Sequence, residues 1–219
     1  CSTNAPWLNV VYDESENEPG QKGDELFDLV QAPPCEDMIL TTKVEKLDVK
    51  KLRREVHRDG DWHESVEIWL SNLEQVLVQQ RSGSKDTNPN RLDCSCAGHV
   101  DVQDLSPEFT AIRELKEEIG LQFQPQDLIF AFLSPCVSRT NTYYDRELVH
   151  VFILPCSNFQ DFRFTVAANE VVNLHVEPIS TVLTDLAQGH KRFVPKPKHY
   201  VDALAHTFQR IKKNNLLKI

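Results

Sequence analysis

Hydrophobic and polar residues alternate along the middle of the chain in a pattern that predicts strands. The segments "SVEIWL" and "QVLVQQR" flank the connection "SNLE", and this order predicts a β-hairpin, because alternate side chains of a strand point to opposite faces. A short strand within "DCSCAGHVDV" runs into a glycine loop. Apolar runs predict three further strands, at 127–133, 147–154 and 170–178.

A helical repeat is clearest in "AIRELKEEIGL" (111–121), where four aliphatic residues share one face and three glutamates share another. Ser106 is the expected N-cap and Pro107 the first helical residue. Gly120 stands where the helix would end. A short helix is expected at 178–188 and an amphipathic C-terminal helix at 197–214.

The first fifty residues show weaker patterns. Residues 1–24 are rich in Asn, Asp, Glu, Pro and Gly, which indicates an irregular arm. The segment 24–30 is compatible with a first strand, and 41–56 with a strand followed by a basic connector. Strands outnumber helices and alternate with them only in part, so the patterns predict an α/β or α+β fold with a mixed sheet.

Composition narrows the class of protein. Of the 219 residues, 40% are hydrophobic and 26% are charged, which suits one large folded domain with or without an extension. The net charge of −9 argues against duplex nucleic acid as the main partner, because phosphate binding needs concentrated Lys and Arg. No apolar run reaches the roughly 18 residues of a membrane span, so no membrane partner is expected.

Six cysteines are spread along the chain without the dense spacing of a disulfide framework. We therefore expect reduced thiols and a cytoplasmic location. Because the chain begins at Cys1 and not at Met, we expect an upstream piece to be missing, which leaves a cleaved targeting peptide and an organelle open. Cys94 and Cys96 have no second pair at metal-site spacing, which argues against a zinc site.

Glu114, Glu117 and Glu118 crowd like charges onto one helical face, where they repel one another. On composition alone, a solvated charged face over a core stripe explains them. The wider stretch "GHVDVQDLSPEFTAIRELKEEIGL" (98–121), however, closely resembles the Nudix box. Its second half, Arg-Glu-aliphatic-any-Glu-Glu-any-Gly-aliphatic, is matched at every fixed position: Arg113, Glu114, Leu115, Glu117, Glu118, Gly120 and Leu121.

The first half of the motif departs from the family pattern. One extra residue lies between Gly98 and Arg113, and Leu105 occupies the place of the isolated glutamate. Asp104 is the nearest carboxylate that could take over its role. The departure concerns this accessory carboxylate and leaves the helical half of the motif whole.

The resemblance implies a Nudix α/β/α sandwich with a mixed sheet over residues 50–215, preceded by an N-terminal extension over 1–49. It implies a hydrolase of diphosphates linked to another moiety, dependent on Mg²⁺ or Mn²⁺. The implied catalytic and metal-binding residues are Glu117, Glu118, Glu114 and Arg113. The glutamates would bind the cation, which offsets their repulsion, with Glu114 as a further ligand or an orienting residue. Arg113 would pair with a glutamate and hold its geometry.

A second resemblance, to type I isopentenyl diphosphate isomerase and its close Nudix relatives, covers roughly residues 50–210. It rests on "REVHRDGDWHESVEIWL", "VLVQQRS", "CAGHV" and "DRELVHVFIL" in this order around the box. In those isomerases three histidines and two acids form a metal site, and the matching positions here are His57, His63, His99, Asp145 and Glu147. The spacing of the first two histidines is one residue shorter here than in the isomerases.

The isomerase's catalytic cysteine corresponds to Ala97, and Cys96 is one residue away. A shift of one residue along a strand turns a side chain to the other face, and alanine supplies no acid. This position and the intact glutamate motif favour a diphosphate hydrolase on an isomerase-like scaffold. An isomerase using Cys96, and a catalytically silent module that binds a nucleotide or a protein, are the alternatives.

The expected partner is a small-molecule diphosphate. Candidates are ADP-ribose, other nucleoside diphosphate derivatives and isoprenoid diphosphates. The predicted substrate-binding residues are His57, His63, Arg81, Gly98 and His99. In relatives, basic residues at the end of the strand "VLVQQ" meet substrate phosphate, which is the reason for including Arg81. The sequence leaves a homodimer open.

Overall fold

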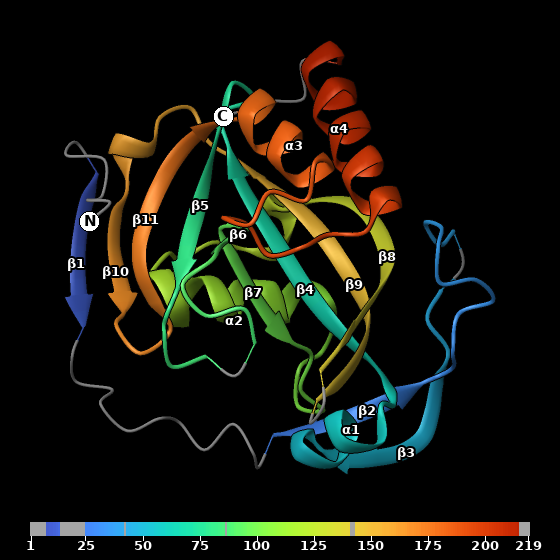
Figure 1. Ribbon diagram of the computed structural model, residues 1–219. Coiled ribbons are helices and arrows are strands. Elements are labelled where there is room, and N and C mark those ends of the chain that lie inside the picture. Colours follow the sequence, from blue (N-terminus) through green and yellow to red (C-terminus); the bar gives the residue numbers. More distant parts are fainter. Residues whose placement is uncertain (1–7, 14–24, 42, 86, 141–142, 215–219) are drawn as a thin grey trace.

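The computed structural model describes residues 8–13, 25–41, 43–85, 87–140 and 143–214. Figure 1 shows the arrangement of the elements within them. The strands are β1 (Asn9–Asp13), β2 (Leu26–Val30), β3 (Lys46–Leu52), β4 (Trp62–Ser71), β5 (Gln75–Arg81), β6 (Leu92–Asp93), β7 (Cys96–His99), β8 (Ile129–Arg139), β9 (Tyr144–Pro155), β10 (Arg163–Ala167) and β11 (Val171–Pro178). The helices are α1 (Arg53–Asp59), α2 (Pro107–Ile119), α3 (Ile179–Ala187) and α4 (Lys198–Lys213).

A mixed sheet forms the middle layer of the molecule. Its strands lie in the order β11-β5-β4-β9-β8, with β6 paired to β5 and β7 paired to β4. β4 and β9 run parallel, whereas the other pairs of this sheet are antiparallel. β4 is buried along its whole length, as expected for a central strand covered on both faces. The predicted α/β fold class is therefore confirmed.

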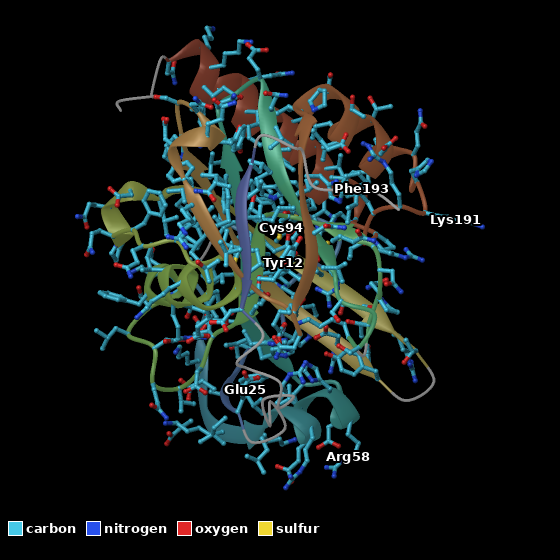
Figure 2. All side chains as sticks on the ribbon, turned by 90° about the vertical axis from the view of Figure 1, so that its left-hand side faces the viewer. Tyr12, Glu25, Arg58, Cys94, Lys191 and Phe193 are labelled. Carbon is cyan, nitrogen blue, oxygen red and sulfur yellow. The ribbon has the colours of Figure 1, made fainter. Side chains whose placement is uncertain are left out.

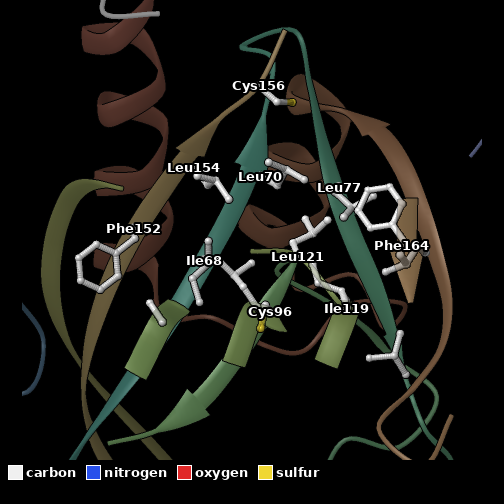
Figure 3. Packing of buried hydrophobic residues seen from close by; sticks show 14 of the residues in the cluster. Ile68, Leu70, Leu77, Cys96, Ile119, Leu121, Phe152, Leu154, Cys156 and Phe164 are labelled. Carbon is white, nitrogen blue, oxygen red and sulfur yellow. The ribbon is translucent and has the colours of Figure 1, made fainter. Parts of the chain in front are cut away.

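Helices cover both faces of this sheet (Figure 1). On one face, Ile119 of α2 shares a hydrophobic core with Ile68 and Leu70 of β4, as Figure 3 shows. On the other face, α3 and α4 form a second core with Trp69. Because successive residues of β4 point to opposite faces, one strand supplies both cores of the α/β/α sandwich.

The N-terminal region contains two separate strand pairings. β2 and β3 are antiparallel and lead directly into α1, and all three lie at one end of the central sheet (Figure 1). Hydrogen bonds from Val102 N to Leu26 O (3.1 Å) and from Leu40 N to Leu133 O (2.9 Å) hold this region in place. β1, marked by Tyr12 in Figure 2, pairs in parallel with β10.

Two parts of the N-terminal half differ from the sequence predictions. Residues 9–13 form β1 although the sequence predicts an irregular arm over 1–24. The partner β10 is far away in the chain, and a single strand without a nearby partner leaves no local hairpin signal. The rest of 1–24, apart from Leu8, lies outside the described residues. The connector expected within 41–56 is the helix α1, which is too short for a clear helical repeat.

The sequence pattern predicted other strands shorter than they are in the structure. The predicted strands 127–133 and 147–154 extend to β8 and β9, because their polar ends continue to pair with each other down to Arg139 and Tyr144. β10 lies in a stretch where no strand was predicted. The described cysteines Cys35, Cys94, Cys96, Cys136 and Cys156 have free thiols. Among the described residues, no helix has the length and apolarity needed to cross a membrane.

The predicted ends of α2 are confirmed. The helix begins after Ser106 with Pro107 in its first position, and it ends at Gly120, whose φ is 73°. This left-handed conformation favours glycine. A Cβ at Gly120 would also lie 2.9 Å from backbone atoms of Thr165 in β10. The Ser106 hydroxyl makes no capping bond and instead donates to Glu108 Oε2 (2.5 Å).

A buried cluster of charges joins β4, β6 and the segment before α4. Lys196 Nζ donates to Glu67 Oε1 (2.6 Å) and lies 3.0 Å from Asp93 Oδ1. The Tyr200 hydroxyl donates to Glu67 Oε2 (2.5 Å) and accepts from Trp69 Nε1 (2.9 Å). Since the Lys196 side chain is only 6% exposed, each charge depends on its protein partner and not on water.

We expect Lys196→Met to lower the free energy of unfolding by roughly 3–5 kcal/mol, because it leaves buried Glu67 without its cation and Asp93 with only the 3.4 Å contact of Arg81. Urea unfolding measures this change. The control is Lys212→Met, which removes the cation of an ion pair with Glu74 whose side chains are 60% and 72% exposed. Equal stability of the two variants would contradict a structural role for the buried cluster.

Candidate active site

Candidate metal ligands converge at the end of the central sheet next to α1. Among the described residues, His57, His63, His99 and Asp145 form a group whose ligand atoms all lie within 4.8 Å of one another. The Nε2 atoms of His57 and His63 lie 3.4 and 3.5 Å from Asp145 Oδ1. His99 Nε2 lies 3.3 Å from Glu147 Oε1. We refer to these five residues as the histidine group.

The register of the sheet brings the histidine group together. His63 of β4 pairs with Glu147 of β9, and Ser65 of β4 pairs with His99 of β7. Residues paired across neighbouring strands point to the same face, as do residues two apart on one strand. His57 comes from α1, which immediately precedes β4.

Several buried polar atoms of the histidine group make no hydrogen bond within the described part of the chain. They are Nε2 of His63, Nε2 of His99 and Oδ1 of Asp145. Buried polar atoms in folded proteins nearly always have a partner. The backbone oxygen of Asp61 lies 3.1 Å from Nδ1 of His63, which places the ring proton there and leaves Nε2 free as a ligand. This donor set therefore fits a divalent cation.

Burial controls the charge of the histidine group. It lowers the pKa of His99 to about 3, despite the opposing effect of Glu147, and it also lowers the pKa of His63. Both rings are therefore neutral near pH 7, which is the form that binds metals. Burial and the neighbouring Glu147 raise the pKa of Asp145. Burial opposes ionisation of Glu147, but the proximity of His99 lowers its pKa, so Glu147 carries the negative charge.

Arg113 holds the acidic side chains around the middle of α2. Its Nη1 donates to Glu114 Oε1 (2.8 Å) and Glu117 Oε2 (3.1 Å), and its Nη2 donates to Asp104 Oδ2 (2.9 Å). Arg113 thus pairs with a glutamate, as the resemblance implies, and its guanidinium offsets three like charges. Asp104 is engaged by Arg113, whereas the side chain of Leu105 is exposed.

The three helix glutamates occupy different environments. Glu118 is buried and accepts hydrogen bonds from Gln79 Nε2 (3.2 Å) and Ala97 N (3.4 Å). Glu114 is also buried, whereas the side chain of Glu117 is 57% exposed. A solvated charged face therefore describes Glu117 but not Glu114 or Glu118. Among the described residues the three glutamates form no group of converging ligand atoms like the histidine group, and their role as metal ligands stays a prediction.

Gly98 allows the glutamate helix to approach the histidine group. A Cβ at this position would lie 2.1 Å from the carboxyl carbon of Glu114, which is closer than two atoms that are not bonded to each other can approach. Gly98, Glu114 and the neighbouring His99 all line the same cavity. The absence of a side chain at Gly98 therefore brings a helix carboxylate and an imidazole to one wall.

This cavity has a volume of about 430 Å³. The predicted site residues that line it are Arg81, Gly98, His99, Glu114, Asp145 and Glu147. Arg53, Lys85 and Lys196 add positive charge to the same wall. Glu117 instead borders a separate hollow of about 210 Å³. Each of the four basic side chains of the cavity also faces a carboxylate of its lining, so Glu114, Asp145 and Glu147 are the acids of the lining that remain for divalent cations.

Two of the predicted substrate-binding residues lie away from the cavity wall, and their role stays a prediction. His57 and His63 are buried, with 4% and 0% of their surface exposed, and lie within the histidine group and not on the cavity wall. Their rings face other ligand atoms, which favours metal binding over contact with substrate. Arg81 does reach the cavity, where its Nη1 donates to Asp93 Oδ2 (3.4 Å) and its Nη2 to Thr87 O (3.2 Å).

Ala97 and Cys96 point to opposite faces of β7. Ala97 lines the cavity, whereas Cys96 lies in the hydrophobic core under α2 (Figure 3). Burial raises the pKa of the Cys96 thiol well above its usual range. The side chain that lines the cavity at the position of the isomerase's cysteine is therefore the methyl group of Ala97.

Sequence reasoning missed four residues at the site: Phe27, Glu67, Tyr143 and Lys196. Tyr143 stacks on His57, with ring centroids 4.4 Å apart. Two of the four had a signal in the sequence. Glu67 is a charged residue within the strand "SVEIWL", and Lys196 stands between two prolines. A charged side chain on a buried strand needs a partner of opposite charge. For Glu67 this partner is Lys196, which comes from a distant segment of the chain.

Comparison with known proteins places the chain in a family. The profile described as the NUDIX domain matches residues 61–197. The chain is 35% identical over 163 residues to "Nudix hydrolase 3" of Arabidopsis thaliana, which covers 72% of this chain and 21% of that protein. It is 34% identical over 135 residues to an uncharacterized Nudix hydrolase of Clostridium acetobutylicum, covering 59% of this chain and 64% of the other.

A shorter match is 36% identical over 81 residues to an isopentenyl-diphosphate Delta-isomerase of Roseobacter denitrificans, covering 37% of this chain and 42% of the other. A solved structure from Deinococcus radiodurans shares the fold, with a TM-score of 0.53 and 21% identity over 85% of this chain and 98% of that one. The chain spans about a fifth of the Arabidopsis relative and less than two thirds of the Clostridium one. Because the profile matches more than half of its length, the chain belongs to the Nudix family.

Proposed function

We propose that this chain is a metal-dependent hydrolase that cleaves the diphosphate linkage of a nucleoside diphosphate derivative or a related diphosphate. One observation carries the proposal: Glu114 of the Nudix helix and two acids of the histidine group line a cavity with seven acidic and four basic side chains, which suits a diphosphate only together with divalent cations. A diphosphate needs both kinds of group, because cations bind its oxygens and carboxylates hold divalent ions beside it. The family match agrees with this chemistry.

Two donor sets of different chemistry meet near the cavity: Glu114 represents the helix carboxylates on its wall, and Asp145 and Glu147 represent the histidine group. The helix carboxylates are hard oxygen ligands that suit Mg²⁺ or Mn²⁺. The histidine group combines imidazoles with carboxylates and suits Mn²⁺, Fe²⁺ or Zn²⁺. When bound, such ions would neutralise charge on the diphosphate and make the attacking water easier to deprotonate.

The chain's own residues then bind and orient the substrate. The two donor bonds of Arg81 fix its guanidinium at the cavity wall, where its buried Nε has no hydrogen-bond partner among the described residues. Arg113 keeps Glu114 and Glu117 in place, and the backbone of Ala97 does the same for Glu118. Water attacks one phosphorus, a carboxylate of the cavity accepts its proton, and the bond from that phosphorus to the bridging oxygen breaks, so that the other phosphate leaves with its own substituent.

The buried charges favour a polar moiety beside the diphosphate. Glu67 lies directly opposite Ala97 across β4 and β7, and both line the cavity together with Lys196. Lys196 and Tyr200 already satisfy Glu67, but Nε of Arg81, which lines the same cavity, is buried and has no hydrogen-bond partner among the described residues. A hydrocarbon chain would leave this donor unpaired, which costs about 1–3 kcal/mol, whereas a hydroxyl group or ring nitrogen of a nucleoside would accept from it.

The second candidate function is an isopentenyl diphosphate isomerase. The convergence of His57, His63, His99, Asp145 and Glu147 favours it, because these positions match the isomerase metal site. The cavity position of the isomerase's cysteine is Ala97, however, and Cys96 lies in the core. The hydrolase is therefore the first candidate function and the isomerase the second.

We expect Glu117→Gln and Glu118→Gln each to lower kcat by roughly 100-fold or more, because a neutral amide binds a divalent cation weakly and metal binding supplies several kcal/mol. The measurement is product release by mass across a panel of nucleoside diphosphate derivatives with Mg²⁺ and Mn²⁺. Glu108→Gln on the same helix is the control and should keep its activity. Normal turnover in both variants would remove the assigned roles.

Gly98→Ala should reduce turnover strongly while the protein remains folded, because the new methyl group displaces the carboxylate of Glu114 from the cavity wall. Circular dichroism and the same product assay test this together. Gly83→Ala is the matched control, since a Cβ there meets only the flexible side chain of Asn90, at 3.2 Å. Similar activity of the two variants would show that the close approach at Gly98 is unimportant.

Incubation with isopentenyl diphosphate and metal should yield no dimethylallyl diphosphate, because Ala97 carries no proton donor. Product analysis by mass and chromatography distinguishes the two isomers. Cys96→Ala should leave hydrolysis of nucleoside diphosphate derivatives unchanged. Isomer formation that disappears in Cys96→Ala would instead establish the second candidate.

A further inference from the structure

Phe27 of β2 lies directly against the histidine group. Its ring is stacked on His63, with centroids 5.2 Å apart and planes at 12°, and on His99, with centroids 4.9 Å apart and planes at 25°. It also meets His57 edge to face at 6.2 Å. Phe27 is 1% exposed. One apolar ring thus contacts every imidazole of the group.

We propose that Phe27 is a positioning residue that orients the imidazoles of the histidine group for a divalent metal ion. The inference rests on the metal role proposed above and adds to it a residue from outside the matched Nudix region, which begins at residue 61.

His99 depends on this contact more than His63 does. A histidine that binds a metal usually has its second ring nitrogen fixed by a hydrogen bond to a carbonyl or carboxylate. His63 has such a bond, to Asp61 O. Within the described part of the chain, His99 has ring contacts and the approach to Glu147 but no hydrogen bond at Nδ1.

The orientation of an imidazole ring is weakly restricted by its own torsion angle, because rotation about the bond to the ring has broad minima. Stacking on a fixed neighbour restricts this rotation. Phe27 has no polar atom that could compete with the metal, and it excludes water from one side of the group. The Phe27 ring therefore restricts the orientation of the His99 imidazole, as the hydrogen bond to Asp61 O restricts that of His63.

The position of Phe27 is itself fixed by backbone bonds on both sides. Val102 N, in the loop before α2, donates to Leu26 O (3.1 Å), and Arg53 N donates to Glu25 O (2.8 Å). The Phe27 ring also packs against Val56 of α1 in a small separate core. Since α1 carries His57, the same packing sets the position of one ligand and the orientation of two others.

The test compares metal binding by Phe27→Leu and by the whole wild-type chain. The probe is Co²⁺, whose visible absorption reports ligand number and geometry, followed by competition with Zn²⁺. We expect Phe27→Leu to weaken Co²⁺ binding roughly 10- to 100-fold, the range seen when the groups that orient ligands are removed. The Co²⁺ absorption band should also change. Phe27→Tyr keeps the ring and should bind within a few-fold of wild type.

Phe164→Leu is the matched control. Phe164 is 0% exposed and belongs to the core under α2, away from the histidine group. Both leucine variants should lower the melting temperature of the metal-free protein, but only Phe27→Leu should lower metal affinity. Phe27→Met serves as a second variant if the leucine variant does not fold.

Wild-type affinity and absorption in the folded Phe27 variants would overturn this proposal while leaving the metal site intact. If wild type binds no Co²⁺ at a site that His99→Ala removes, the histidine group holds no metal, and both this proposal and that part of the proposed function fail. Loss of affinity in Phe164→Leu equal to that in Phe27→Leu would also overturn it, because general loosening of the fold would then explain the effect.

Discussion

The parallel pairing of β4 with β9 is the constraint on which the site depends. Its register runs without interruption from Trp62 opposite Arg146 to Ser71 opposite Pro155. One face of β4 presents His63 and Glu67 toward the cavity side and Trp69 toward the core under α3 and α4. A slip of one residue would turn all of them to the face under α2, where the other core lies. Burial of the hydrophobic residues of β4 in the two cores therefore fixes the direction in which its polar residues point.

Charge balance is the second constraint. The chain carries 33 acidic and 24 basic residues, yet the buried acids near the cavity have cations close by. Lys196 lies between Glu67 and Asp93, and Arg113 binds Glu114. The histidine group differs, because burial keeps His63 and His99 neutral, so that the imidazoles do not balance the negative charge of Glu147. A divalent cation would complete the balance there.

The sequence predicted the parts of the molecule that follow local rules. The ends of α2 were predictable because Pro107 and Gly120 have strong backbone preferences. The central strands were predictable because β4 alternates in part and β5 has a short apolar run between polar ends. β1 was not predictable, since it is stabilised by pairing with β10 across most of the chain. The contact of Phe27 with the histidines was hidden for the same reason: nothing near it in the sequence indicates an imidazole.

β7 connects the two donor sets within three consecutive residues. The backbone of Ala97 binds Glu118, the bare Cα of Gly98 makes room for Glu114, and the ring of His99 joins the histidine group. None of these roles except the last uses a side chain. A cysteine in place of Ala97 could keep the same backbone bond and still point into the cavity. On this scaffold, the choice between hydrolysis and isomerisation therefore rests on a few side chains around an unchanged strand, and not on the fold.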